Sequence, residues 1–95
     1  MSRFEWDERK NEINHRKHKL HFETAVLAFD DPHCVLFVER VEAGEERWHA
    51  IGAVSETLIA TVAHTYQIEG ADEIIRIISA RFANRREKEL YAETL

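Results

Sequence analysis

Residues 34–51 read CVLFVERVEAGEERWHAI, and this stretch decides the fold class. Two runs rich in β-branched and aromatic residues, Cys34–Arg40 and Arg47–Ile51, lie on either side of the turn residues Glu42-Ala43-Gly44. Such runs, joined by a short segment that contains glycine, are typical of a β-hairpin. The connection is too short for the crossover helix that parallel strands need, so the pattern predicts antiparallel pairing.

Two further runs of the same kind, Thr57–Tyr66 and Ile74–Ser79, follow the hairpin. The turn residues Glu69-Gly70-Ala71-Asp72 separate them, and no crossover helix fits between them either. The sequence therefore predicts a four-stranded antiparallel sheet in which consecutive strands are neighbours.

Two helices are expected before the sheet. Asp7 can accept hydrogen bonds from the first free amides of a helix that runs to about Lys19. The pair Asp31-Pro32 should end the second helix, because a residue before proline is driven out of the α-helical region. Between these points, apolar residues recur with the spacing of a short core-facing helix, and they are Phe22, Ala25, Val26 and Phe29.

A third helix is expected after the sheet, where Asn84 and Glu87 have the spacing of a capping box. The predicted order is α-α-β-β-β-β-α, an α+β class with helices over a face and an end of the sheet. A chain of 95 residues is the size of one small domain, so residues 1–95 are expected to form a single unit. This size favours an open surface groove over a deep pocket.

Positive charge gathers in two short segments of an acidic chain. The net charge is −5, yet residues 9–21 and residues 76–88 each carry five lysines and arginines against one glutamate. Residues 22–75 hold two arginines and eleven acidic residues. If folding brings the two basic segments together, they form a patch that can hold a polyanion. The alternative is that both segments are solvated helix faces without a ligand.

Composition excludes several classes of protein. The single cysteine, Cys34, cannot form an internal disulfide, and its apolar neighbours favour a buried structural thiol over a nucleophile. No apolar run approaches the roughly 20 residues of a membrane span, and no signal-peptide pattern follows Met1. We therefore expect a cytoplasmic protein that does not contact a membrane.

A metal site on the first helix is a weak alternative. His15, His18 and His21 are spaced by three residues, so neighbouring pairs could share a helix face and bind a transition metal. Helical rotation places the first and third histidines about 120° apart. No carboxylate or thiolate completes a tetrahedral set, and we predict no metal or other cofactor.

An ordered set of motifs resembles the pattern of the BrnT-type toxins. Each fragment alone is weak, but the set covers nearly the whole chain. Several positions depart from the pattern. Lys19 stands where the family usually has a glycine that ends the first helix in a left-handed conformation, Glu8 stands where a proline is common, and the segment before Arg76 is longer and more acidic. The motifs are Phe4-Glu5-Trp6-Asp7, Lys10, Asn14, Lys17-His18, Phe22-Glu23, Asp31-Pro32, Gly44-Glu45-Glu46-Arg47, Ile51-Gly52, Arg76-Ile77-Ile78-Ser79-Ala80-Arg81, Arg86-Glu87 and Tyr91.

The resemblance implies a toxin of a type II toxin–antitoxin pair, with a compact fold similar to RelE ribonucleases. It also implies metal-independent cleavage of RNA that inhibits translation. The partner it implies is a BrnA-type antitoxin with a DNA-binding portion, held in a hetero-oligomer that covers the cationic surface. We expect acidic residues 39–46 to lie away from that surface and to repel stray polyanions or help set the orientation of the partner. The alternative is a non-enzymatic interaction module, or an inactive toxin homologue, that binds an antitoxin-like partner without turnover.

Metal-free cleavage of RNA needs groups that move protons at the 2′-hydroxyl and the 5′-oxygen, and cations that stabilise charge on the phosphate. Histidine can serve the first need, and arginine and lysine the second. The predicted RNA-binding residues are Lys10, Asn14, Arg85, Arg86 and Tyr91. The predicted catalytic residues are Lys17, His18, Arg47, Arg76 and Arg81, and of these we expect Lys17, Arg76 and Arg81 to face a common groove with Arg47 nearby.

Each candidate also has a structural interpretation. Arg76 and Arg81 are five residues apart, so in one regular strand they would point to opposite faces. They converge only if the strand ends before Arg81. His64 lies on an apolar strand face, which favours a buried histidine over a catalyst. Arg47 could form a surface ion pair with the glutamates before it, and Tyr91 could pack in the core.

Overall fold

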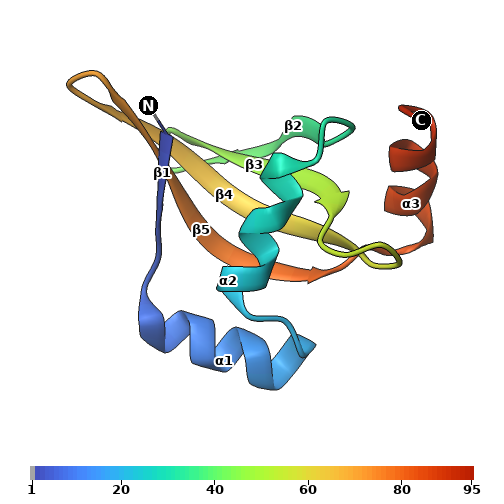
Figure 1. Cartoon of the computed structure of the whole chain (residues 1–95). Coiled ribbons are helices and arrows are strands. Elements are labelled where there is room, and N and C mark those ends of the chain that lie inside the picture. The colour runs from blue at the N-terminus through green and yellow to red at the C-terminus, as the bar shows by residue number, and fades with distance from the viewer. Residues whose placement is uncertain (1) are drawn as a thin grey trace.

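The computed structural model describes residues 2–95 as one sheet with helices on both of its faces (Figure 1). The strands lie in the spatial order β1-β5-β4-β3-β2. Among residues 2–95, no helix is long and apolar enough to span a membrane. In chain order the elements are β1 (Ser2–Glu5), α1 (Glu8–His18), α2 (Phe22–Ala25), the 3-10 helix η1 (Val26–Asp30), β2 (Val35–Glu42), β3 (Glu45–Ala53), β4 (Ile59–Glu69), β5 (Asp72–Phe82) and α3 (Arg85–Ala92).

The sheet differs from the predicted one by a strand at its edge. Strands β2 to β5 form the predicted antiparallel meander. However, β1 pairs with β5 in parallel, with Ser2 opposite Glu73 and Glu5 opposite Arg76. The prediction of four antiparallel strands preceded by two helices was therefore wrong, because the sheet is mixed and has five strands. The strand β1 has only four residues and finds its partner near the other end of the chain, so no local pattern marks it.

Helix α1 begins and ends through local hydrogen bonds. Asp7 caps it as predicted, because its carboxylate accepts from the Arg9 N–H at 2.9 Å. At the other end, the Lys19 N–H donates to the His15 carbonyl at 2.8 Å. Lys19 has φ 60° and ψ 30°, the left-handed conformation that the family pattern assigns to a glycine. A β-carbon in this conformation costs about 1 kcal/mol.

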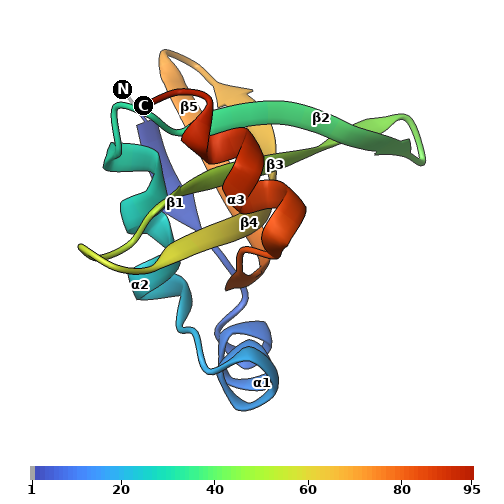
Figure 2. The same cartoon turned by 90° about the vertical axis from the view of Figure 1, so that its right-hand side faces the viewer.

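Two cores lie on opposite faces of the sheet. Helices α2 and η1 cover one face, the α2 face, where Phe22 packs with Val62 and Ile77. Helix α3 lies over one end of the other face, the α3 face, where Tyr91 packs with Ile51. Figure 2 shows α3 in front of β3 and β4, with α2 to one side.

The helix η1 lies unusually close to β3. A β-carbon at Gly52 would lie 2.4 Å from the Ala28 carbonyl oxygen, so only glycine fits at this position. Nearby, Asp31 takes an extended conformation before Pro32 and ends η1 as predicted. The Asp31 carboxylate accepts from the Ala53 N–H at 2.8 Å and from the Tyr91 hydroxyl at 2.5 Å. The end of η1 therefore holds both β3 and α3.

The predicted capping box begins α3. The Asn84 side chain accepts from the Glu87 N–H, and the Glu87 carboxylate accepts from the Asn84 N–H, both at 2.9 Å. Two donors that would otherwise lack partners are thus satisfied at the start of the helix. This cap fixes where the chain leaves β5, and so where α3 meets the sheet.

Candidate functional site

A β-bulge interrupts the regular alternation of side chains in β5. Ala63 pairs with Ser79, but the next residue of β4, His64, pairs with Ile77. Ile78 is therefore an extra residue without a partner in β4. An extra residue of this kind reverses which face the following side chains occupy.

The bulge places Arg76 and Arg81 on the same face. Arg76 pairs with Thr65, and Arg81 pairs with Thr61. These threonines are four residues apart in β4 and share a face, so their partners share it as well. The strand does not end before Arg81, as we had expected convergence to require, since β5 runs to Phe82.

Three cavities, of about 250, 190 and 130 Å³, adjoin one another around Ile78 on the α3 face. Helix α1 forms one wall and the hairpin of β2 and β3 the other. We refer to these cavities together as the basic groove. Its cationic and histidine side chains are Lys10, Lys17, His18, Arg40, Arg47, His49 and Arg76, and its acidic side chains are Glu39 and Glu45.

Buried asparagines hold α1 against the sheet and so aim its lysines. Asn14 donates to the Ala80 carbonyl at 2.8 Å and accepts from the Ala80 N–H at 3.1 Å, beyond the point where β1 stops pairing with β5. Asn11 accepts from the Phe22 N–H at 2.8 Å. Lys10 and Lys17 are seven residues apart on the same side of the helix as Asn14, which places both in the groove.

The cations of the groove are weakly paired. Within residues 2–95, Lys10 and Lys17 make no ion pair. The nearest atoms of Arg76 and Glu5 are 3.2 Å apart, and their side chains are 44% and 40% exposed. Exposed ion pairs contribute under about 1 kcal/mol, so a phosphate could replace them.

Arg47 is the cation whose surroundings are least satisfied. Its side chain is 29% exposed and lies 3.8 Å from Glu42 and 3.9 Å from Glu45. The buried Nε–H of Arg47 has no hydrogen-bond partner among residues 2–95. Leaving a buried donor unpaired costs about 1–3 kcal/mol, more for a charged group. An anionic acceptor in the groove would remove that cost.

His49 is a groove residue that the sequence analysis missed. It lines a cavity together with Arg47, two residues before it in β3. Burial lowers the pKa of His49, although the charges of Glu39 and Glu87 act in the opposite direction. The imidazole is therefore neutral at pH 7 and can accept a proton. The period of two along the strand could have revealed it, because His49 must share a face with Arg47.

The other histidines differ in their positions. His18 is half-buried and lines a cavity with Lys17. His64 is fully buried on the α2 face, as its apolar strand face predicted, with Nδ1 3.1 Å from the Val62 carbonyl oxygen. Burial lowers the pKa of His64 to about 4. It is therefore separated from the groove by the sheet.

Arg81 lies on the groove face but lines none of the three cavities. Two of its nitrogens donate to the Glu87 carboxylate at 2.6 and 2.9 Å. Burial acts to raise the pKa of Glu87, but hydrogen bonds from Arg81 and the Asn84 N–H outweigh it and lower this pKa to about 2. The pair joins β5 to α3 at one end of the groove.

The other predicted RNA-binding residues either lie outside the groove or already use their polar groups in structural hydrogen bonds. Asn14 borders a groove cavity, but its amide serves Ala80 and the Leu20 carbonyl. Tyr91 is buried and bonded to Asp31, so it has a structural partner. Arg85 and Arg86 are exposed on α3, and Arg85 lies 3.6 Å from Glu89.

A metal site and a reactive cysteine are the other kinds of chemistry considered for this chain. Within residues 2–95, no three side chains of histidine, cysteine or acidic type are placed to hold a metal ion. His15 and His21 instead stack, with ring centroids 3.7 Å apart. Cys34 is half-buried, and burial together with the charge of Asp31 raises the pKa of its thiol to about 11. Such a thiol is a poor nucleophile.

The fold and the groove define a small α+β protein whose mixed sheet carries a cationic groove, a site suited to a phosphate-rich ligand. A family model described as "Ribonuclease toxin, BrnT, of type II toxin-antitoxin system" matches residues 6–87. The chain therefore belongs to the BrnT family of ribonuclease toxins, which confirms the resemblance read from its motifs.

A solved structure is similar over nearly its whole length. The 1.1 Å crystal structure of the ribonuclease toxin BrnT from Brucella abortus has a TM-score of 0.65 and 29% sequence identity to this chain. The match covers 90% of this chain and 99% of that one. A search of curated proteins gave no match.

Proposed function

We propose that the chain is an endoribonuclease that needs no metal, that its active site is the basic groove, and that its cleavage of RNA inhibits translation. The observation that carries the proposal is Arg47, whose buried Nε–H has no hydrogen bond within residues 2–95 and only a 3.8 Å contact to Glu42, in a groove that also contains Lys10 and Arg76. A non-bridging phosphate oxygen is a charged acceptor, and hydrogen bonds between charged partners are stronger than neutral ones. Charge that builds on the phosphate during cleavage would strengthen them further.

The groove offers candidates for both proton transfers. Neutral His49 is suited to take the proton from the 2′-hydroxyl, which then attacks the phosphorus. His18, on the α1 wall of the groove, is the candidate to give a proton to the departing 5′-oxygen. One bond forms between the 2′-oxygen and phosphorus and one breaks to the 5′-oxygen, so a cyclic phosphate and a free 5′-hydroxyl result. Lys17 and Arg76 would hold the phosphate between the two histidines.

Arg81, Arg85 and Arg86 have supporting roles in this proposal. Arg81 positions α3 through Glu87 and keeps further N–H groups free for a passing phosphate. Arg85 and Arg86 would contact RNA that extends beyond the groove. We leave Asn14 and Tyr91 out of the RNA surface because their polar groups are already bonded.

The family implies an antitoxin partner, and we propose that it is of the BrnA type, carries a DNA-binding portion and covers the groove in a hetero-oligomer. Carboxylates of the partner placed beside Lys17 and Arg47 would occupy the positions of phosphates. Access of RNA to the groove would then be blocked sterically, and the rim of the complex would be sensitive to salt.

The test is cleavage of a labelled RNA by the purified chain in excess chelator. We expect cleavage to persist in the chelator and the Arg47→Ala variant to lose about 100-fold in rate, as is typical when one charge-stabilising donor is removed. Arg3→Ala is the matched control, because Arg3 forms exposed ion pairs with Glu69 and Asp72 and lines none of the groove cavities. Thermal unfolding of both variants shows that the fold survives. Loss of all cleavage in chelator, restored by Mg²⁺, would contradict the proposal.

A binding module without catalysis is the second candidate, and one observation favours it. Glu39 and Glu45 line the groove and repel a phosphate backbone. If the wild-type chain binds RNA without cleaving it, and Glu39→Gln with Glu45→Gln does not restore cleavage, the binding module is the better description.

A further inference from the structure

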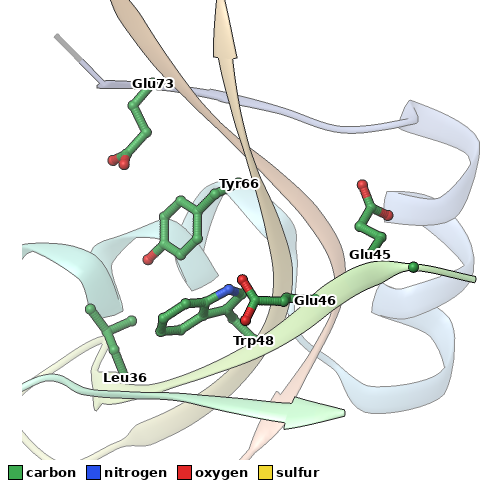
Figure 3. Close-up of a pocket in the computed structure, with 7 residues that line it drawn as sticks. Leu36, Glu45, Glu46, Trp48, Tyr66 and Glu73 are labelled. Carbon is green, nitrogen blue, oxygen red and sulfur yellow. The ribbon is translucent and has the colours of Figure 1, made fainter. Parts of the chain in front are cut away.

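A larger cavity, of about 580 Å³, lies on the α2 face and has no role in the proposed function (Figure 3). Trp48 pairs with His64 in the sheet, and Tyr66 pairs with Ile75, and both partners are buried on that face. The cavity is therefore across the sheet from the basic groove. Its lining residues are Leu36, Gly44, Glu45, Glu46, Trp48, Tyr66 and Glu73, and of these only Glu45 also borders the groove.

Aromatic rings form one wall of this cavity. The rings of Trp48 and Tyr66 meet edge to face, with centroids 5.2 Å apart. Tyr66 in turn meets His64 at 4.9 Å, so the wall is anchored in the core. Beside the rings, Leu36 is 46% exposed. Figure 3 shows Leu36, Trp48 and Tyr66 gathered around the opening. The aromatic surface is rigid and only partly covered.

Carboxylates form the rim, and no lysine or arginine of the described part of the chain, residues 2–95, lines the cavity. Glu46 makes no ion pair or hydrogen bond within residues 2–95, and Figure 3 shows its carboxylate beside the Trp48 indole. Glu73 accepts a single hydrogen bond of 3.3 Å, from the Ser2 hydroxyl. Aromatic faces beside carboxylates attract a cation, and the same carboxylates repel a phosphate backbone.

We propose that this acidic aromatic cavity binds an arginine side chain of the antitoxin. The proposal rests on the toxin–antitoxin pairing given above as the proposed function. Arginine fits better than lysine, because its planar guanidinium can stack on Trp48 while it donates to Glu46 and Glu73. An apolar side chain next to that arginine would cover Leu36.

The antitoxin would then touch the chain at two sites of opposite charge, one on each face of the sheet. Carboxylates would lie in the basic groove and an arginine in the acidic aromatic cavity. A reversed partner would place like charges together at both sites, so the two contacts fix its orientation.

The first test uses a short synthetic peptide, N-acetyl-Leu-Arg-Leu-amide, and the same peptide with citrulline in place of arginine. Nuclear magnetic resonance follows the indole N–H signals of Trp6 and Trp48 separately. We expect the arginine peptide to shift the Trp48 signal and not the Trp6 signal, and to bind about tenfold more tightly than the neutral citrulline peptide. Equal binding of the two peptides, or equal shifts of both indoles, would overturn the proposal.

Variants locate the site without disturbing the fold. The double variant Glu46→Gln, Glu73→Gln keeps the size of both side chains and should weaken the arginine peptide about tenfold. Glu56→Gln, at an exposed loop position, is the matched control and should leave binding unchanged. Unchanged binding of the arginine peptide to the double variant would contradict the proposal.

The second test separates this inference from the proposed function. In the double variant we expect the free chain to cleave RNA at the wild-type rate, and the antitoxin to bind it about tenfold more weakly. Failure of RNA cleavage in the wild type would refute the ribonuclease proposal while the peptide result stands. Unchanged antitoxin affinity in the double variant, or a Trp48 shift caused by an RNA oligonucleotide, would refute the cavity proposal while cleavage stands.

Discussion

The two faces of the sheet carry opposite charge although the same strands form both. On the α3 face, Lys17, Arg47 and Arg76 surround the bulge residue Ile78. On the α2 face, Glu45, Glu46 and Glu73 line a cavity that has an aromatic wall. The net charge of −5 therefore hides a cationic groove, because the acidic residues of the middle segment are largely placed elsewhere. The net charge of the chain does not indicate a ligand; the charge on each face of the sheet does.

Each face also holds one histidine from the sheet, His49 on the α3 face and His64 on the α2 face. Replacing each in turn tests whether the two faces have different roles. Replacing His49 by alanine removes the proposed base from the groove, so we expect RNA cleavage to fall about 100-fold. Because burial lowers the pKa of His49, the wild-type rate should stay high as the pH falls to 6.5 and decline only below it. Measured pH–rate profiles should show this acid limb in the wild type and not in His49→Ala.

His33→Ala is the control for that experiment. His33 is exposed in a loop, its Nδ1 lies 3.0 Å from the Thr94 carbonyl oxygen, and it lines none of the groove cavities. Equal losses in the two variants, or an acid limb that survives the removal of His49, would show that this histidine is not the base.

His64, on the opposite face, should affect stability and not catalysis. The pKa of His64 is about 4 in the folded chain, against 6.5 for an ordinary histidine. Between these values the unfolded chain binds a proton that the folded chain does not, so stability is complete above pH 6.5 and falls as the pH drops to 4. At pH 5 the loss should be about 2 kcal/mol.

Urea unfolding at pH 7 and pH 5 measures this loss. The variant His64→Phe keeps an aromatic ring between Phe29 and Tyr66, and its stability should no longer depend on pH in this window. An equal pH dependence in wild type and variant would assign the effect to other groups.

Local patterns in the sequence predicted the hairpin, both helix caps and the end of η1, because each depends on residues that are neighbours in the chain. The strand β1 depends on β5, whose residues are distant in sequence, so its four residues carried no signal. The bulge at Ile78 was equally hidden, since nothing in an apolar run marks the residue that loses its partner. It places Arg76 and Arg81 on the same face without the early end of the strand that we expected this to require.

For the candidate site as well, the sequence suggested individual residues but not how the fold brings them together. Lys17 and Arg47 could be proposed from residue type and from the family pattern, but their convergence depends on α1 packing beside the bulge. The acidic aromatic cavity needs Trp48 and Tyr66 from two different strands, so no spacing in the sequence reveals it.

The variant Arg81→Ala tests whether this arginine on the groove face stabilises the fold or binds RNA. Its partner Glu87 is only 10% exposed, so removal of the guanidinium leaves a nearly buried carboxylate with the Asn84 N–H. Because Arg81 is 39% exposed and water can replace part of it, we expect Arg81→Ala to lower the free energy of unfolding by only about 1–2 kcal/mol.

Denaturant unfolding of Arg81→Ala and Arg85→Ala measures the difference. Arg85 forms an exposed pair with Glu89 and should contribute less than about 0.5 kcal/mol. RNA cleavage should fall less in folded Arg81→Ala than in Arg47→Ala. A loss as large as that of Arg47→Ala, without a loss of stability, would restore Arg81 to the catalytic set.

The smallest expected effect concerns Lys19, which ends the helix that presents Lys17 and His18 to the groove. Lys19→Gly removes a β-carbon from a left-handed position but gives the unfolded chain more freedom, so the gain in stability should be about 0.5 kcal/mol. The same change at Lys88, inside α3, should instead cost about 1 kcal/mol. Because Lys19 lines none of the groove cavities, cleavage should be unchanged. If Lys19→Gly destabilised the chain, the left-handed turn would not be a source of strain. If it changed the cleavage rate, the end of α1 would be setting the position of Lys17 in the groove.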